Sequence, residues 1–166
     1  MNSKIKADLT STACYSSESE DTEKQSNGFS WTDCSYAHDP VKFKHISVQP
    51  DPIELPGSLS FEGSTYLSRP ISSMTAEITL YKKALLWWKI PCLNSFPCSF
   101  DLCELVGHDS SCTFSSGYLH SSKRSYYFSR PPISSYLLKG YYSATITLKS
   151  QGKQVGCAYV YFNIDG

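Results

Sequence analysis

The sequence predicts an all-β domain, a sandwich or open barrel of about eight antiparallel strands with one short helix. Three observations lead to this prediction. Short stretches alternate between apolar and polar side chains, which is typical of strands with one buried face. Turn-forming Pro and Gly residues separate these stretches. Aromatic residues make up 14% of the 166 residues and charged residues 18%, below the usual quarter, which suits a single compact domain.

The expected strands follow one another along the chain. The clearest, at 75–81, alternates strictly between apolar and polar residues. The sequence Ser-Gln-Gly-Lys at 150–153 predicts a tight hairpin turn. Only residues 99–106 have a helical pattern, with Ser99 as the expected N-cap. The strands are expected at residues 41–49, 58–66, 75–81, 85–90, 126–129, 142–148 and 155–162.

Two parts of the chain differ in composition. Residues 1–28 are rich in Ser, Thr and acidic residues and contain almost no large apolar side chains. They are expected to be disordered, because such a segment buries too little surface to offset its ordering entropy. Residues 29–166 are expected to form the folded domain, starting at Phe29. The formal net charge of zero gives no indication of nucleic-acid binding, and no run of residues has the length and apolar character of a membrane-spanning helix.

The seven cysteines divide into Cys14 in the N-terminal segment and six in the expected domain. An even set in a small aromatic domain favours disulfides and an oxidising compartment, although the sequence alone does not choose the pairing. The Cys-x-x-Cys spacing of zinc sites is absent, so no metal is expected. The N-terminus lacks the apolar core of a secretory leader. We expect that the leader is missing from this version of the sequence; a cytosolic protein with reduced thiols is the alternative.

Two neighbouring tryptophans, Trp87 and Trp88, occupy the strand expected at 85–90. Side chains of adjacent residues in a strand point to opposite faces. Trp88 shares its face with Leu86 and Ile90, an apolar set, and is therefore expected to line the interior. Trp87 belongs to the other face. It is expected either at a rim that enters a membrane interface, where indole rings are favoured, or packed beneath the short helix.

A second apolar stretch, Tyr136-Leu137-Leu138, lies just before Gly140 between two expected strands. It predicts either an exposed loop that probes a membrane or a plug that closes one end of a sandwich. Lys and Arg residues gather near both aromatic segments, which favours an anionic membrane surface as a peripheral partner. The histidines are not accompanied by a nucleophile-elbow motif, so neither catalysis nor a cofactor is expected.

The chain contains, in this order, the segments VQPDPIELPG, LWWKIPC, FDLCELV and YYSATITLKSQGKQVGC. This series resembles the ML lipid-recognition family, and within it the ganglioside activators, from about Phe29 to the C-terminus. The resemblance implies a β-cup, in which two sheets enclose an apolar cavity for the tails of a lipid. It further implies a non-catalytic protein that lifts a ganglioside, a glycosphingolipid, from a membrane and presents it to a lysosomal β-hexosaminidase.

The resemblance also implies a disulfide pattern. It suggests the pairs Cys34–Cys157, Cys92–Cys98 and Cys103–Cys112. The chain departs from the family in two respects. The loop between Cys103 and Cys112 is shorter and lacks an additional disulfide, and no Asn-x-Ser/Thr glycosylation sequon occurs.

Two sets of residues are the candidates for a binding site. The lipid and membrane surface is expected at Trp87, Trp88, Tyr136, Leu137 and Leu138. The wall of the cavity or core is expected at Ile78, Leu80, Ile90, Ile146 and Val160. Two alternatives stay open: a sterol or phospholipid carrier of the same family without an enzyme partner, and an extracellular interaction domain with a packed interior and no ligand. The expected compartment is the lysosome or the extracellular space.

Overall fold

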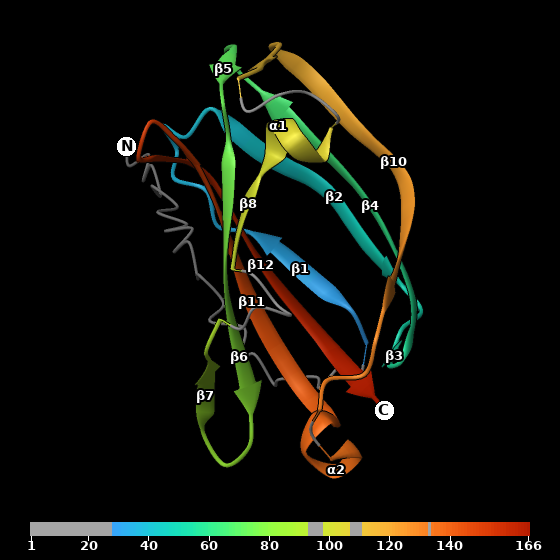
Figure 1. The fold of residues 1–166 in the computed structure, drawn as a ribbon. Helices are drawn as coiled ribbons and strands as arrows, with labels where there is room; N and C mark the ends of the chain where they lie inside the picture. Colours follow the sequence, from blue (N-terminus) through green and yellow to red (C-terminus); the bar gives the residue numbers. More distant parts are fainter. Residues whose placement is uncertain (1–27, 93–97, 107–110, 133) are drawn as a thin grey trace, which may run out of the picture.

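The computed structural model describes residues 28–92, 98–106, 111–132 and 134–166 (Figure 1). The expectation of disorder for residues 1–28 therefore lies outside the described residues, except at Gly28. Within the described parts, two β-sheets built almost entirely of antiparallel pairs face each other, and three disulfides join cysteines. The predicted all-β, disulfide-bonded fold class is confirmed.

The larger sheet is antiparallel apart from one short parallel pair. Its spatial order is β1 (Ser30–Asp33), β12 (Lys153–Asp165), β11 (Gly140–Ser150), β6 (Thr75–Lys83) and β7 (Trp87–Ile90). At its margins, β3 (Ile53–Glu54) pairs in parallel with β12, and β8 (Ser99–Asp101) pairs with β6. The smaller sheet has the order β10 (Gly117–Phe128), β4 (Gly57–Leu67) and β2 (Val41–Gln49). A separate short ladder joins β5 (Ile71–Ser72) and β9 (Thr113–Phe114).

Two strands differ from the sequence-based expectation. The stretch expected at 126–129 is the end of β10, whose preceding residues are mostly polar and so give no strand pattern. Leu85 and Leu86 belong to the turn of the β6–β7 hairpin and not to the strand. The Ala84 N–H donates to the Leu86 carbonyl at 2.9 Å, which closes this turn. Leu86 is therefore not part of an interior strand face.

In the part of the chain that the structure describes, two single-turn helices are present where one helix is expected. The first, α1 (Leu102–Leu105), follows β8, and its N-cap is Asp101 and not Ser99, because the Asp101 carboxylate accepts a hydrogen bond from the Cys103 N–H at 2.8 Å. The second, α2 (Ser135–Leu138), is too short to give a periodic sequence pattern. The hairpin turn expected at 150–153 is confirmed: Gln151 and Gly152 have φ values of 52° and 76°, which a two-residue hairpin turn requires.

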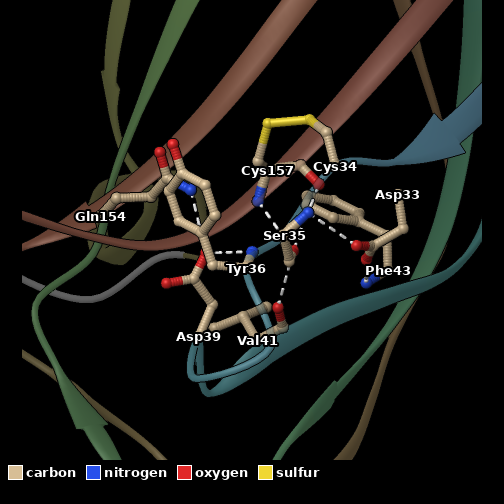
Figure 2. Close-up of a disulfide and its surroundings, with 9 residues drawn as sticks. All are labelled: Asp33, Cys34, Ser35, Tyr36, Asp39, Val41, Phe43, Gln154 and Cys157. Atoms are coloured by element: carbon tan, nitrogen blue, oxygen red, sulfur yellow. Dashed lines mark hydrogen bonds between the residues drawn. A yellow bond between two sulfur atoms is a disulfide. The ribbon is translucent and has the colours of Figure 1, made fainter.

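The two sheets are joined along one side, where β12 and β1 approach β2. Cys34, which follows β1, forms a disulfide with Cys157 of β12 (Figure 2). The Cys34 N–H donates to the Cys157 carbonyl at 3.0 Å. The Ser35 hydroxyl accepts a hydrogen bond from the Cys157 N–H at 3.0 Å and donates to the Val41 carbonyl at 3.1 Å. We call this junction of the larger sheet with the start of β2 the seam.

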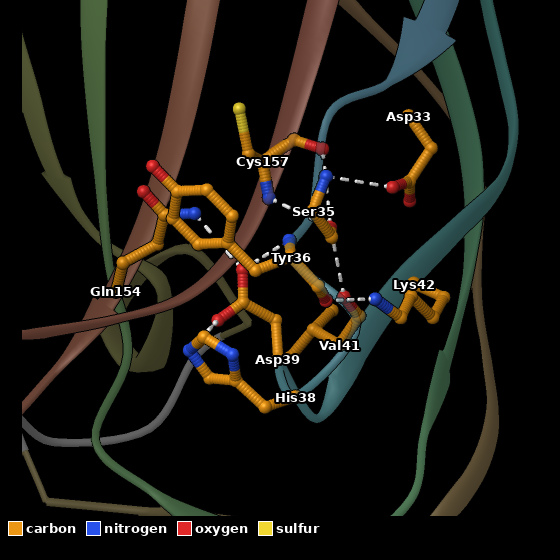
Figure 3. Close-up of polar contacts among 9 residues, drawn as sticks. All are labelled: Asp33, Ser35, Tyr36, His38, Asp39, Val41, Lys42, Gln154 and Cys157. Atoms are coloured by element: carbon orange, nitrogen blue, oxygen red, sulfur yellow. Dashed lines mark hydrogen bonds and ion pairs between the residues drawn. The ribbon is translucent and has the colours of Figure 1, made fainter.

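A buried carboxylate completes the seam (Figure 3). Asp39 lies in the connection between β1 and β2, and its side chain is fully buried. Its Oδ2 accepts hydrogen bonds from the Tyr36 N–H and from Gln154 Nε2 of β12, both at 2.9 Å. Its Oδ1 lies 3.8 Å from His38 Nε2. Since hydrogen bonds to a charged acceptor are among the strong ones, Asp39 fixes this connection against β12.

Replacing Ser35 with alanine removes the hydroxyl from the seam and leaves the Cys157 N–H and the Val41 carbonyl without this partner. We expect the free energy of unfolding to fall by about 1–3 kcal/mol, the usual cost of unpaired buried polar groups. Urea unfolding of the full chain with its disulfides intact measures this value. Ser60→Ala is the matched control, because the Ser60 hydroxyl makes an exposed hydrogen bond, and its effect should stay below about 0.5 kcal/mol. Equal losses for both variants would contradict the role of Ser35.

Candidate functional site

Among the described residues, the buried apolar side chains form two separate clusters and no continuous core. One cluster of buried residues adjoins α1, and the other includes Leu138 of α2; these two helices lie at opposite ends of the molecule (Figure 1). The first cluster contains Val41, Leu67, Ile71, Met74, Ala76, Leu148 and Val155. The second contains Ile53, Leu59, Leu138, Tyr142 and Ile164. The middle of the two inner sheet faces lies between the clusters.

The five wall candidates come together on one face of the larger sheet. Ile90 stands opposite Leu80, and Val160 belongs to the same row two strands further on. Ile78 and Ile146 form the adjacent row. This face is turned to the smaller sheet, because Leu80 and Ile146 pack against clusters that contain residues of β4. Val160 is 6% exposed, whereas the other four are only partly buried, as expected where the facing sheet does not cover them fully.

The opposite wall is aromatic, and its residues are not among the sequence-based candidates. Phe61 shares the inner face of β4 with Leu59, and Tyr126 of β10 stands opposite Leu59. The ring of Phe61 lies 6.1 Å from that of Tyr126 and 6.3 Å from that of Phe128. Although they face inward, Phe61 is 37% and Tyr126 43% exposed. Alternation along β4 could have indicated Phe61, but the run of adjacent aromatics in β10 gives no such signal.

The exposed inner faces indicate a hollow that opens on the side away from the seam. The sheets approach each other where β12 meets β2. On the other side, β7 ends the larger sheet and β10 ends the smaller one, and within the described residues no strand pairing joins these two edges. Because solvent reaches Phe61 and Tyr126 on the inner face of the smaller sheet, side chains of the larger sheet do not fill the space in front of them. An apolar surface is therefore accessible between the two packed ends.

Exposed apolar side chains gather at one end of this hollow. The β6–β7 hairpin and α2 both lie there (Figure 1). The exposed fraction ranges from 59% for Leu137 to 100% for Leu85. We call this set the rim; it consists of Leu85, Leu86, Trp88, Tyr136 and Leu137. The turn residues Leu85 and Leu86 are missing from the sequence-based candidates, because the sequence pattern placed them in a strand.

Leu138 does not share the exposure of its neighbours. It is 4% exposed and belongs to the cluster with Ile53 and Leu59. The Tyr142 hydroxyl donates to the Leu138 carbonyl at 2.6 Å, and burial raises the pKa of this tyrosine. The single turn of α2 thus directs Leu138 into the core and leaves Tyr136 and Leu137 outside.

Trp87 and Trp88 lie on opposite faces of β7. Trp88, a member of the rim, stands opposite Lys82 on the inner face. Trp87 lines a shallow groove of about 300 Å³ on the outer face of the larger sheet, together with Tyr81, Ser143 and Tyr161. The ammonium of Lys83 lies 5.7 Å from the centre of the Trp87 ring. Trp87 does not pack beneath α1, which is at the other end of the molecule (Figure 1).

Two further findings bear on the chemistry of the site. Among the described residues, no group of three or more His, Cys, Asp or Glu side chains is placed to hold a metal ion. Within the same residues, no helix has the length and apolar character needed to cross a membrane. The three disulfides are Cys34–Cys157, Cys92–Cys98 and Cys103–Cys112, the pairs that the sequence resemblance implies.

Sequence comparisons give one family and two closely matching relatives. A family model described as the ML domain matches residues 28–164. The Ganglioside GM2 activator of Mus musculus is 30% identical over 165 residues, which cover 86% of this chain and 84% of the mouse protein. The Ganglioside GM2 activator of Macaca fascicularis is 29% identical over 167 residues, which cover 86% of each chain.

Solved structures are similar in fold at low sequence identity. The C-terminal domain of Wzt matches with a TM-score of 0.52 and 9% identity, covering 81% of this chain and 78% of that chain. A Niemann-Pick type C2 protein from the Japanese carpenter ant matches with a TM-score of 0.45 and 12% identity, covering 81% of this chain and 98% of that chain. At 9% identity, the likeness to the Wzt domain concerns the fold alone.

Exchanging Leu137 for serine removes one exposed leucine from the rim without touching a buried side chain. We expect the affinity of the full chain for anionic vesicles to fall about tenfold, the value of one leucine transferred from water to an apolar phase. Vesicle cosedimentation measures the affinity. Leu105→Ser is the control, because Leu105 is similarly exposed but belongs to α1 at the opposite end. A comparable loss for the control would argue against the rim as the membrane-facing surface.

Proposed function

Because the chain belongs to the ML-domain family, a lipid-recognition family, we propose that it extracts a glycosphingolipid of the ganglioside class from membranes. The protein then carries the lipid and presents its sugar head to a glycosidase, a lysosomal β-hexosaminidase. It acts as a non-catalytic activator. Both curated relatives are themselves named activators of this kind, and their similarity to this chain extends over most of its length.

The observation that carries this proposal is the accessible apolar surface between the two packed ends. Its walls are Ile78, Leu80, Ile90 and Ile146 on one sheet and Phe61 with Tyr126 on the other. Each methylene of an acyl chain that enters such a space gains roughly 0.8 kcal/mol. A lipid with two long tails therefore covers surface that is unfavourable in contact with water.

The rim accounts for the exchange of lipid with a membrane. Its leucines and aromatic rings enter the polar–apolar boundary of a bilayer, where Trp and Tyr are favoured. Lys83 and Lys89 lie on the hairpin beside these residues and attract an anionic lipid surface. With the rim inserted, an acyl chain passes from the bilayer to the inner wall without crossing bulk water.

The proposed compartment is the lysosome or the extracellular space. Three disulfides in a chain of this size are typical of proteins that fold in an oxidising compartment. The ganglioside class of the lipid and the identity of the glycosidase rest on the similarity to the two activators.

Lipid mass spectrometry on the full chain tests the proposal most directly. The protein is secreted from eukaryotic cells and purified without detergent. We expect a stoichiometric glycosphingolipid, or its uptake from glycolipid vesicles at acidic pH. A sterol or phospholipid in its place would favour a different carrier of the same family. Absence of both retained lipid and uptake would indicate a packed sandwich and contradict the proposal.

Filling the hollow should block lipid uptake at little cost in stability. Ile78→Trp adds volume on the inner face, and we expect lipid transfer to fall about tenfold while the free energy of unfolding changes by less than about 1 kcal/mol. In a packed core the same enlargement would cost about 1–3 kcal/mol. Thr79→Trp is the matched control, because Thr79 neighbours Ile78 in β6 and points to the outer face. Transfer assays and urea unfolding distinguish the two cases.

A further inference from the structure

One side chain interrupts the apolar inner face of the larger sheet. In β6, Ile78 and Leu80 point inward, and Lys82 follows at the next inward position. Lys82 stands between Tyr142 of β11 and Trp88 of β7. Its row lies two residues, or about 7 Å, beyond the row of Leu80 and closer to the rim. The lysine is thus placed where the apolar wall ends, beside the buried cluster that contains Tyr142. We call this place, where the rim meets the open side of the hollow, the mouth.

The position of the Lys82 ammonium is fixed by its surroundings. The Nζ atom donates a hydrogen bond to the Leu137 carbonyl in α2. It also lies 5.5 Å from the centre of the Tyr142 ring, which in turn stacks on Phe162. The stem packs closely against Gly140, where a Cβ atom would stand 3.2 Å from Lys82 Cε. These contacts therefore restrict the conformational freedom of the Lys82 side chain and hold its ammonium at the mouth.

The charge of Lys82 is not matched by an acidic partner. Within the described parts of the chain, the ion pairs involve other cations, and no carboxylate lies within ion-pair distance of Lys82. An ammonium has three N–H donors, and the Leu137 carbonyl takes one. Partial burial lowers the pKa of Lys82 through desolvation. A partly desolvated cation with free donors binds an anion more strongly than a fully hydrated one.

We propose that Lys82 binds the negatively charged headgroup of the lipid whose tails occupy the hollow. This inference rests on the proposed lipid-carrier function and adds a residue that selects the ligand by charge. The shared chemistry is a lipid anion, either the carboxylate of a sialylated glycosphingolipid or the phosphate of an anionic phospholipid. Since the ammonium lies one row beyond the apolar wall, it meets the headgroup where that group leaves the hollow.

The test compares lipid extraction by the full chain from four kinds of vesicle. They contain a sialylated glycosphingolipid, its desialylated counterpart, phosphatidylglycerol or phosphatidylcholine, with the same hydrocarbon tails within each pair of charged and neutral lipid. Lys82→Gln removes the charge but keeps an N–H donor for the Leu137 carbonyl in α2. We expect it to reduce extraction of at least one anionic lipid about tenfold and to leave its neutral counterpart within about twofold. The anionic lipid affected identifies the source of the anion.

Lys89→Gln is the matched control for membrane charge. Lys89 lies on the same hairpin but stands opposite Tyr81 on the outer face. It contributes to vesicle attraction as Lys82 does. All four vesicles carry the same excess of one anionic background lipid, so the loss of this attraction affects them alike, and replacing Lys89 should leave the ratio of anionic to neutral lipid extracted within about twofold of the unmodified chain. If Lys89→Gln lowered that ratio as much as Lys82→Gln, the charge preference would belong to the membrane surface, and the proposal would be overturned.

Three other outcomes are equally clear. If Lys82→Gln changes no lipid, or reduces anionic and neutral lipids alike, Lys82 only anchors α2 and the proposal fails. If the unmodified chain extracts none of the four lipids, the carrier function itself fails. Thermal unfolding accompanies each assay. Lys82→Met, which keeps the packed stem, replaces Lys82→Gln if the latter unfolds.

Discussion

The seam around the Cys34–Cys157 disulfide is the constraint on which the rest of the structure depends. Two facing sheets are usually held together by packing over their whole interface. Here a disulfide fixes the connection from β1 to β2 onto β12 of the larger sheet. It links residues that are 123 positions apart, a cross-link worth about 4–5 kcal/mol in the chain-entropy model. The Ser35 hydroxyl then joins β12 to the start of β2, and Asp39 in the β1–β2 connection accepts a hydrogen bond from Gln154 of β12. With one side fixed in this way, the opposite side of the sandwich does not have to be packed.

Like the seam, the two buried clusters stabilise the fold without requiring a packed interior at the hollow. An apolar surface left in water costs about 25 cal/mol per Å² relative to burial, so an open hollow destabilises the empty protein. The buried cluster next to α1 and the one beneath α2 supply hydrophobic stabilisation on either side of it. Under the proposed function, stability and lipid binding depend mainly on different residues: Val41 and Leu67 are fully buried in a packed cluster, whereas Ile78 and Leu80 are only partly buried on the inner face.

Much of the fold could be predicted because strict alternation marks the strands with one buried face. This holds for β6, β11 and β12, and for the tight turn between the last two. Residues 120–125 in the middle of β10 are polar on both faces, so the pattern that marks a strand is absent there. The Asp101 cap and the turn at Leu85 depend on local hydrogen bonds that a hydrophobic pattern does not report.

The candidate site could be predicted only in part, for a related reason. Alternation assigns a residue to a face, and all five wall residues do lie on one face. It does not report the separation of the two sheets. Ile78 and Val160 give the same signal in the sequence but differ in burial, because only Val160 lies near the seam side of the sheet. The same holds for Lys82. Alternation along β6 places it on the inner face, but its position at the mouth depends on how the two sheets come together.

The distance between the seam and the rim has a consequence for the diversification of this scaffold. Glu77 of β6 is level with Cys157 of the seam, and Lys82 lies five residues further along the strand, roughly 17 Å away. The β6–β7 turn and the segment containing α2 are thus connections at the end of the sheets, at a distance from the seam that holds the sheets together. Loops of this kind tolerate insertions and exchanges better than the elements they connect. Changes in these two segments can therefore alter the ligand preference while the fold stays the same.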